Sequence, residues 1–432
     1  MRFKNFSPVE RHTATLLLWG ALFNGVVQSL GQTQDIIARK ALHAQDWQLM
    51  LMTMIWPISN FFSIWWGRAF ENSCHKARLI FIAGIIGRLS LVGAVWIVTM
   101  NQYLLLLALL FSSNSLLIPA QNSIYQRNIT KHWRARLYGY TISLGMLVSV
   151  IFTYGAGRLL DVREESFRWI LVVTGICGFI TSALWASIRI QEPLSQKSCE
   201  KPRFKDLALD PIRRTLTLLK ENKPFAAFER SFSIYGMGFI MMQPIIPIYM
   251  VDKLNLSYTN NFLAKGVLSQ IGMLLLSPMI GKLHDRLHPF RFISASFALL
   301  MVFPLLFISS SLWVGSPIAV VIVFIAYLIF GIAMTGVNIA WNMSSIFFAG
   351  KDDASMYQSV HVTMTGIRGL IAPVLGFTLL KVFNISVVFF VAAGFLAWAS
   401  LISLRDHRRL AKQLPEPRPE DLEELSDLPK PL

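Results

Sequence analysis

Residues 317–340 read PIAVVIVFIAYLIFGIAMTGVNIA and contain no charged side chain. The stretch is too long for a buried element of a soluble domain, and it fits a bilayer crossing, which needs about 20 apolar residues. A segment in lipid must satisfy its own backbone polar groups, so a helix is expected. Only 15% of the whole chain is charged, whereas soluble domains average about 25%. Composition therefore points to a membrane protein.

Similar apolar segments recur along the sequence and predict an all-α membrane protein with twelve transmembrane helices. Their expected bounds are 14–34, 47–66, 78–100, 102–124, 137–156, 168–189, 231–250, 262–281, 291–312, 317–340, 359–380 and 384–403.

The basic residues predict the orientation of these helices. Most of the 40 lysines and arginines fall in the segments that are cytoplasmic if the N-terminus is inside, as the positive-inside rule requires. Both termini are therefore expected in the cytoplasm, with the chain in a bacterial inner membrane. The rule also accounts for the net charge of +16, so no nucleic-acid partner is expected.

The polar segments divide the chain. Residues 191–224 contain four prolines and are expected to form a cytoplasmic linker, in which residues 206–220 could form an amphipathic helix on the inner leaflet. The linker separates two six-helix bundles, residues 1–190 and 225–405. The proline-rich and acidic residues 406–432 predict a disordered cytoplasmic tail. The three cysteines form no C-x-x-C pair, so neither a metal site nor a disulfide framework is expected.

A short pattern recurs where spans end: Gly67-Arg-Ala-Phe-Glu71, Gly157-Arg-Leu-Leu-Asp161 and Gly281-Lys-Leu-His-Asp285. Without the linker, the copies lie about 90 residues apart, which corresponds to three spans with their loops, and such repeats are typical of secondary transporters.

The third copy continues through Asp285 and Arg286 to Arg291, and it resembles the G-x-L-x-D-R-x-x-R/K-R loop of the major facilitator superfamily. The first copy, with Gly67, Arg68 and Glu71, is degenerate. The resemblance implies two six-helix bundles built from inverted three-helix repeats. It also implies that these loops act as gates, with Gly281 allowing close helix contact. The expected gating residues are Gly67, Arg68, Glu71, Gly281, Asp285, Arg286 and Arg291.

Two arginines are expected deep in the membrane, Arg88 in span 3 and Arg368 in span 11. No acidic residue is expected near the middle of a span, because Asp35 and Glu229 fall at span ends. Arginines without acidic partners favour an anionic solute or an anionic lipid headgroup. Alternatively, they cap backbone carbonyls or pair with a span-end acid. We interpret Arg88 as a buried charge and Arg368 as a binding residue.

Polar side chains on spans 1, 4, 7, 10 and 11 are the other candidates for binding a solute. Those on span 1 lie one turn apart on a single face. In the superfamily, spans 1, 4, 7 and 10 line the central cavity. His361 could carry a proton or could be a packing residue. Close helix contacts and bending points are expected at Gly366, Gly369, Pro373 and Gly376 in span 11 and at Gly145, Gly155 and Gly157 in span 5. The predicted binding residues are Asn24, Gln28, Gln32, Asn114, Gln121, Tyr235, Gln243, Asn338, Trp341, Asn342, His361 and Arg368.

These features predict a secondary active transporter that moves a small solute by alternating access, with the arginines favouring an anion. The alternative is a lipid or lysolipid flippase on the same fold. The sequence has no Walker A stretch and no recognisable catalytic motif, so it predicts neither ATP hydrolysis nor an enzyme. We expect no cofactor and no metal site. The expected partners are a small-molecule substrate and membrane lipid, with the monomer as the functional unit.

Overall fold

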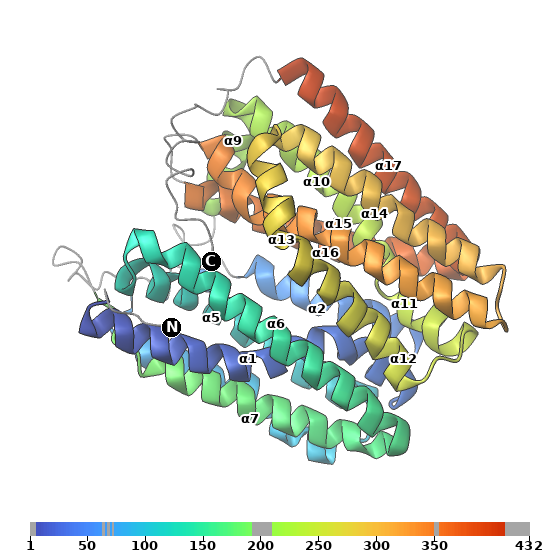
Figure 1. The fold of residues 1–432 in the computed structure, drawn as a ribbon, viewed down its shortest axis with the longest axis horizontal. Coiled ribbons are helices and arrows are strands. Elements are labelled where there is room, and N and C mark those ends of the chain that lie inside the picture. The colour runs from blue at the N-terminus through green and yellow to red at the C-terminus, as the bar shows by residue number, and fades with distance from the viewer. Residues whose placement is uncertain are drawn as a thin grey trace.

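The computed structural model describes residues 6–62, 65–66, 70, 73–191, 210–349 and 354–410. Within these ranges the regular secondary structure is helical, and long helices run beside one another (Figure 1). The all-α membrane fold predicted from the sequence is confirmed.

The helices before the linker form what we call the N-terminal group. They are α1 (Pro8–Lys40), α2 (Asp46–Phe61), α4 (Lys76–Ala83), the π-helical η1 (Gly84–Arg88), the 3-10 helix η2 (Leu89–Trp96), α5 (Met100–Asn128), α6 (Lys131–Val162), η3 (Glu164–Ser166) and α7 (Phe167–Ala186).

The helices after the linker form the C-terminal group. They are α10 (Lys223–Met242), α11 (Ile245–Ile248), the π-helical η4 (Tyr249–Lys253), α12 (Tyr258–Phe262), the π-helical η5 (Leu263–Leu268), α13 (Ser269–Arg286), α14 (Pro289–Ser311), α15 (Pro317–Ala349), α16 (Ala354–Val382) and α17 (Ile385–Leu410).

Local sequence explains where two long helices, α1 and α5, begin. At the start of α1, Ser7 and Glu10 form a capping box, in which each side chain accepts a hydrogen bond from the other residue's backbone N–H (2.9 and 3.2 Å). Thr99 and Gln102 form the same arrangement at α5. Each box satisfies backbone donors that the first helical turn leaves unpaired.

Ten helices in the described part of the chain are long and apolar enough to cross a membrane. The expected spans 47–66 and 262–281 are not among them. Helix α2 has 16 residues, and the second region is divided between α12, η5 and α13, with Lys265 in the π-helical turn. The count of twelve transmembrane helices is therefore not confirmed.

Two predicted boundaries were wrong. Helix α10 begins at Lys223 rather than at residue 231, so Glu229 lies within it and is 1% exposed. Helix α17 continues to Leu410, so the predicted disordered tail cannot begin at residue 406. Asp406 is buried and accepts a hydrogen bond from Arg230 (2.7 Å). Each error arose because a charged residue was taken to end a span.

The structure describes only part of the predicted linker, residues 191–224. Helix α9 (Asp210–Glu221) overlaps the amphipathic helix expected over residues 206–220. Residues 206–209, and the tail from residue 411 onward, lie outside the described ranges. Cys74 is disulfide-bonded, contrary to expectation, whereas Cys177 is a free thiol.

Figure 1 shows the N-terminal group, with α1, α5, α6 and α7, on one side and α10, α14, α15 and α17 on the other. The groups meet where α2 packs on α16 and where α6 packs on α12 and η5. A Cβ on Gly369 would overlap the ring of Pro57, and one on Gly366 would lie 3.0 Å from the Cβ of Phe61. Close contact is confirmed at these two glycines and also at Gly376, Gly145 and Gly157. It is wrong for Gly155, where a Cβ would meet nothing within 4 Å in the described part of the chain.

Candidate functional site

A buried carboxylate and imidazole face each other inside the C-terminal group. His361 on α16 is 0% exposed, and its Nδ1 lies 2.6 Å from Oε1 of Glu229 on α10. Ionisable groups are costly to bury within a membrane-spanning bundle, and they persist there mainly where they are paired or functional. This pair is therefore the centre of the candidate site.

Arg368 extends the pair by two turns along α16. Its Nη1 donates to the Phe232 carbonyl (2.5 Å), and its Nη2 donates to Thr365 Oγ1 (2.7 Å). Thr365 in turn donates to the His361 carbonyl (2.9 Å). Glu229 also acts electrostatically on the guanidinium. The carboxylate, imidazole and guanidinium together form one cluster, which we call the buried triad.

Each member of the buried triad retains an unused polar atom. Among the described residues, Glu229 Oε2, His361 Nε2 and Arg368 Nε are buried and have no hydrogen-bond partner. An unsatisfied buried donor or acceptor costs about 1–3 kcal/mol, and more for a charged group. The cluster therefore keeps three polar atoms that are not bonded to protein groups in the described part of the chain.

Aromatic side chains enclose the imidazole. The ring centroids of Phe232 and Trp341 lie 4.9 and 5.3 Å from that of His361, both edge to face. Tyr235 stacks on Phe297 at 4.7 Å, one turn along α10 from Phe232. Aromatic rings thus surround the imidazole of the buried triad, and Trp341 connects it to α15.

Glu229 lies in the first third of the span Lys223–Lys253, so no acid is found near its middle, but Glu229 is buried (1% exposed) rather than solvated at the span end. Glu229 follows Phe225 and Phe228 and precedes Phe232, and all three phenylalanines are fully buried. Apolar residues three and four positions apart mark a helix face directed inward. The expected span began only after Arg230. Applied to the whole of α10, which begins at Lys223, this pattern would have predicted that Glu229 faces the interior. Arg368 therefore matches the alternative expected for the arginines, in which the guanidinium caps a backbone carbonyl with an acid from a span end nearby.

Arg88 is buried (4% exposed) and bound by groups of the protein. Its Nη1 donates to the Gly178 carbonyl (3.1 Å), while Nε and Nη2 approach Asn114 Oδ1 at 3.4 and 3.3 Å. The prediction of a buried charge is confirmed, in the form in which the arginine caps a backbone carbonyl. Asn114, expected to bind solute, instead accepts hydrogen bonds from this guanidinium.

The other predicted binding residues differ in their access to a solute. Tyr235, His361 and Arg368 are buried, and Asn342 donates to the Asn338 carbonyl (2.8 Å). The exposed members are Gln28, Asn338 and Asn342, and the half-buried ones are Asn24, Gln32, Asn114, Gln121, Gln243 and Trp341. A solute could reach the exposed and the half-buried residues directly, so their role in binding stays a prediction.

The predicted gating loops are only partly described. Gly67, Arg68 and Glu71 lie outside the described residues. Gly281 and Asp285 lie on α13, and Arg286 and Arg291 are exposed. A Cβ on Gly281 would meet nothing within 4 Å. Within the described residues nothing packs against Gly281 in this conformation, so its expected role in close helix contact stays a prediction.

Charged side chains instead connect the two groups at the end where α1 finishes. Asp35 on α1 pairs with Lys265 on η5, and Lys265 is 8% exposed. Arg39 on α1 donates to Asp252 on η4, with Nε 3.0 Å from Oδ1. Two further links join the groups, Lys40 Nζ to the Leu256 carbonyl (2.9 Å) and Lys381 Nζ to Asp46 Oδ2 (2.8 Å). Within the N-terminal group, Arg39 also pairs with Asp46 (3.1 Å).

The start of α12 is held from the other group. Asp161 at the end of α6 accepts hydrogen bonds from the backbone N–H groups of Tyr258 and Thr259 (2.6 and 2.9 Å). The Tyr258 hydroxyl donates to Glu164 (2.6 Å). Burial, and then this neighbouring carboxylate, raise the pKa of Tyr258. We call all these contacts the end network. Sequence reasoning missed it because Asp35 and Lys265 are 230 positions apart.

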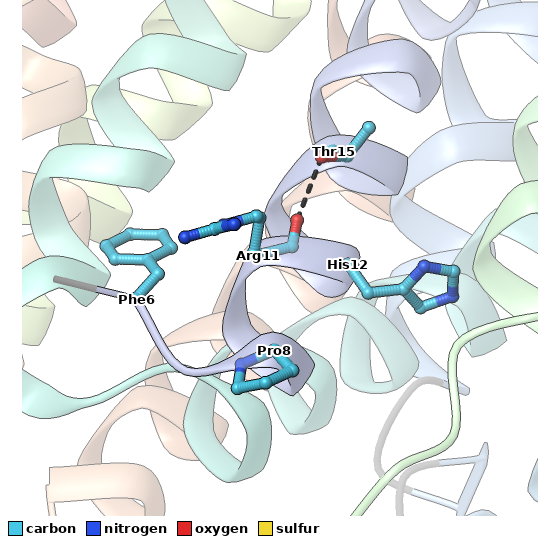
Figure 2. Close-up of a pocket in the computed structure, with 5 residues that line it drawn as sticks. All are labelled: Phe6, Pro8, Arg11, His12 and Thr15. Atoms are coloured by element: carbon cyan, nitrogen blue, oxygen red, sulfur yellow. Dashed lines mark hydrogen bonds between the residues drawn. The ribbon is translucent and has the colours of Figure 1, made fainter. Parts of the chain in front are cut away.

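A separate pocket of about 420 Å³ lies at the start of α1 (Figure 2). It is lined by Phe6, Pro8, Arg11, His12 and Thr15, with Thr15 Oγ1 donating to the Arg11 carbonyl (2.8 Å). The pocket shares no residue with the predicted binding set or the buried triad, so it is not the predicted solute site.

Comparison with known proteins gives the same family as the loop motif. The sequence model of the Major Facilitator Superfamily matches residues 141–373. No curated protein matches the sequence.

Solved structures share the fold at low identity. The nucleoside transporter NupG is 13% identical, with a TM-score of 0.66 over 93% of this chain and 99% of that one. A POT family transporter in complex with 5-aminolevulinic acid is 13% identical, with a TM-score of 0.71 over 94% and 98%. A bacterial homolog of the human lysosomal transporter Spinster, in an inward-facing and unoccupied conformation, is 12% identical, with a TM-score of 0.65 over 96% and 100%.

Proposed function

Because the chain belongs to the major facilitator superfamily of membrane transporters, we propose that it carries a small polar solute by alternating access. In this proposal residues 1–190 and 225–405 are two bundles that rock about the solute. The observation that supports it is the end network, which connects α1, α2 and α6 to η4, α12, η5 and α16 through charges and hydrogen bonds.

Such an interface can open and close at modest cost. The exposed fractions of the Asp252 and Lys381 side chains are 35% and 55%, and exposed ion pairs contribute about 0–1 kcal/mol each. Asp35 and Lys265 are more enclosed, so separating them requires that water or a new partner reach both charges. This pair would therefore provide most of the barrier to opening.

Orientation follows from the distribution of basic residues. With both termini in the cytoplasm, the end network lies on the outer side of a bacterial inner membrane. The conformation described would then be closed to the outside, and a solute would reach the exposed and half-buried residues of the predicted binding set from the cytoplasmic side. A single chain contains both bundles, so the monomer suffices.

We infer the nature of the solute from the exposed polar residues of the predicted binding set rather than from the arginines. The Nη donors of Arg368 and the Nε, Nη1 and Nη2 donors of Arg88 contact protein groups, and each residue is 4% exposed. The case for an anionic solute or a lipid headgroup assumed arginines with free faces and no acid nearby, and Glu229 removes that premise for Arg368. Uncharged hydrogen-bonding groups of a small solute match Gln28, Asn338 and Asn342.

Solute transport can be tested without knowing the solute in advance. Purified protein is screened by thermal shift against small metabolites, where a true ligand at a hundredfold excess over Kd adds about 2.7 kcal/mol. The stabilising compound, radiolabelled, should then show counterflow into proteoliposomes loaded with the same compound unlabelled. Binding without counterflow would contradict the proposal, and movement of fluorescent lysolipid alone would favour a flippase.

A further inference from the structure

We propose that the acidic segment over residues 420–428 docks in the pocket at the start of α1, and that this contact obstructs the cytoplasmic entrance to the solute site. The docking itself does not depend on transport. Only its effect on the solute rests on the proposed function.

The pocket combines apolar and cationic side chains. Its volume is about 420 Å³, and Phe6 and Pro8 line it together with Arg11, His12 and Thr15. Figure 2 shows the Arg11 guanidinium extending toward the Phe6 ring. A guanidinium has five N–H donors, so Arg11 can bind a carboxylate in addition to its contacts within the protein. The pocket therefore fits an apolar side chain that is flanked by carboxylates.

The charge around the pocket is positive. Glu10, in the first turn of α1, is buried, and its carboxylate accepts two backbone N–H groups at 2.9 and 3.1 Å. Arg136 is exposed, and its guanidinium lies over the Trp133 ring at 5.1 Å. Trp133 in turn contacts Phe6 edge to face, with 5.3 Å between the ring centroids. This face of the molecule therefore attracts an anionic ligand.

The chain contains such a ligand in its own sequence. Residues 420–428 read EDLEELSDL, with five acidic residues and no basic one. Leu422 stands between Asp421 and Glu423, which is the chemistry that the pocket fits. The chain as a whole carries a net charge of +16, so its basic cytoplasmic face attracts this segment.

The acidic segment is attached at the same end of the molecule as the pocket. In Figure 1 the end of α17 and the start of α1 both lie on the left of the view, at one end of the long helices. Helix α17 ends at Leu410, and the nine residues 411–419 lead from it to the acidic segment. Nine residues can span at most about 30 Å.

The docked segment would connect the two groups. Helix α17 belongs to the C-terminal group and α1 to the N-terminal group, so the chain would cross between them. With both termini in the cytoplasm, it would cross at the end from which the solute enters.

An anionic lipid headgroup is the other ligand that basic residues at a membrane surface attract. We favour the acidic segment for two reasons. A headgroup phosphate has no apolar side chain between its charges to place against Phe6 and Pro8. A tethered segment also has an effective concentration in the millimolar range.

The first test maps the contact in the whole chain. A photo-cross-linking amino acid at Leu422 should couple to residues 6–15 of the same molecule, as read by mass spectrometry, whereas the same probe at Leu414 should not. The absence of this cross-link would overturn the docking. A cross-link to lipid, or one between two molecules, would overturn it equally.

A charge swap tests the specificity of the contact. Arg11→Glu should lower the yield of the cross-link by about fivefold, the change that one exposed ion pair can produce. Glu423→Arg in the same chain should restore the yield, because the pair is then reversed rather than lost. Arg158→Glu, at an exposed position near the other end of α6, is the matched control. An unchanged yield in Arg11→Glu would contradict the site.

The second test reads the obstruction without any solute. Asn338→Cys, with the native cysteines replaced, reports access to α15 through its rate of reaction with a membrane-impermeant maleimide on the cytoplasmic side. The rate should rise several-fold in Arg11→Glu and return to its starting value in the charge-swapped chain. An unchanged rate would overturn the obstruction. Missing counterflow beside an intact cross-link would count against the transport function and leave the docking established.

Discussion

Gly236 on α10 is the residue that makes room for the buried triad. A Cβ at this position would overlap Cδ and Nε of Arg368. The guanidinium is held by the Phe232 carbonyl and Thr365, so it cannot move aside without losing both hydrogen bonds.

We therefore expect Gly236→Ala to destabilise the protein by about 1–3 kcal/mol, the usual cost of overpacking. This exceeds the roughly 1 kcal/mol that alanine gains over glycine in a helix. Thermal unfolding in detergent measures the difference. Gly394→Ala is the matched control, because a Cβ there meets nothing within 4 Å. Equal melting temperatures for the two variants would show that Arg368 is not held as described.

His288, between α13 and α14, gives a pH-dependent prediction. Burial, and then the neighbouring His407, lower the pKa of His288 to about 4. An unfolded chain protonates this histidine below about pH 6.5. Between these values the unfolded state binds more protons, so stability falls as the pH falls and is fully retained above the window.

His288→Asn removes the titration and keeps a side-chain acceptor for the Phe290 N–H, which His288 Nδ1 now accepts at 3.3 Å. The melting temperature of the variant should drop less than that of the wild type between about pH 8 and about pH 5. His12→Asn, at an exposed position, is the control. A drop as large as in the wild type would exclude His288 as its source.

Individual residues were predicted unevenly from the sequence. Burial of Arg88 followed from its depth in an apolar segment, and it was correct. The partners of Arg88, namely Asn114 and the Gly178 carbonyl, depend on how three helices meet. Sequence periodicity shows which face of a helix is apolar, but not which residue of another helix lies opposite.

At the scale of elements, the start of α12 depends on a residue outside its own group. Asp161 accepts the N–H groups of Tyr258 and Thr259, so it acts as a capping residue from α6. Capping side chains contribute about 0.5–2 kcal/mol.

Asp161→Ala should therefore fray α12, and hydrogen exchange at residues 258–262 should accelerate by roughly tenfold, which corresponds to 1.4 kcal/mol. Asp161→Asn keeps one acceptor oxygen and should show a smaller effect. Exchange at α14, far along the chain, serves as the internal reference. Unchanged exchange in Asp161→Ala would mean that α12 is held by packing alone.

Helices were predicted better than their ends. The uncharged stretch over residues 317–340 corresponds to α15, which runs on to Ala349. Charged residues were treated as span ends, and this rule failed at α10 and α17, where Glu229 and Asp406 are buried with partners. A hydropathy profile cannot predict that a charged residue is buried, because its burial depends on a partner elsewhere in the chain.

At the scale of the whole molecule, the family and the helical membrane fold followed from apolar segments and one loop motif. The end network did not, because its ion pairs join residues that are distant in sequence. Alternating access involves the whole molecule, since it requires the two groups to separate at one end while the rest of each group stays packed.

The central claim is that the end network is a closed gate between two moving bundles. The most direct measurement is the distribution of distances between spin labels at Val162 and Leu312 in wild type, in Asp35→Asn and in Lys265→Met. We predict a short distance in the wild type and an added population of longer distances in both variants, because each loses the most enclosed ion pair of the network. An identical, single short distance in all three proteins would contradict the account.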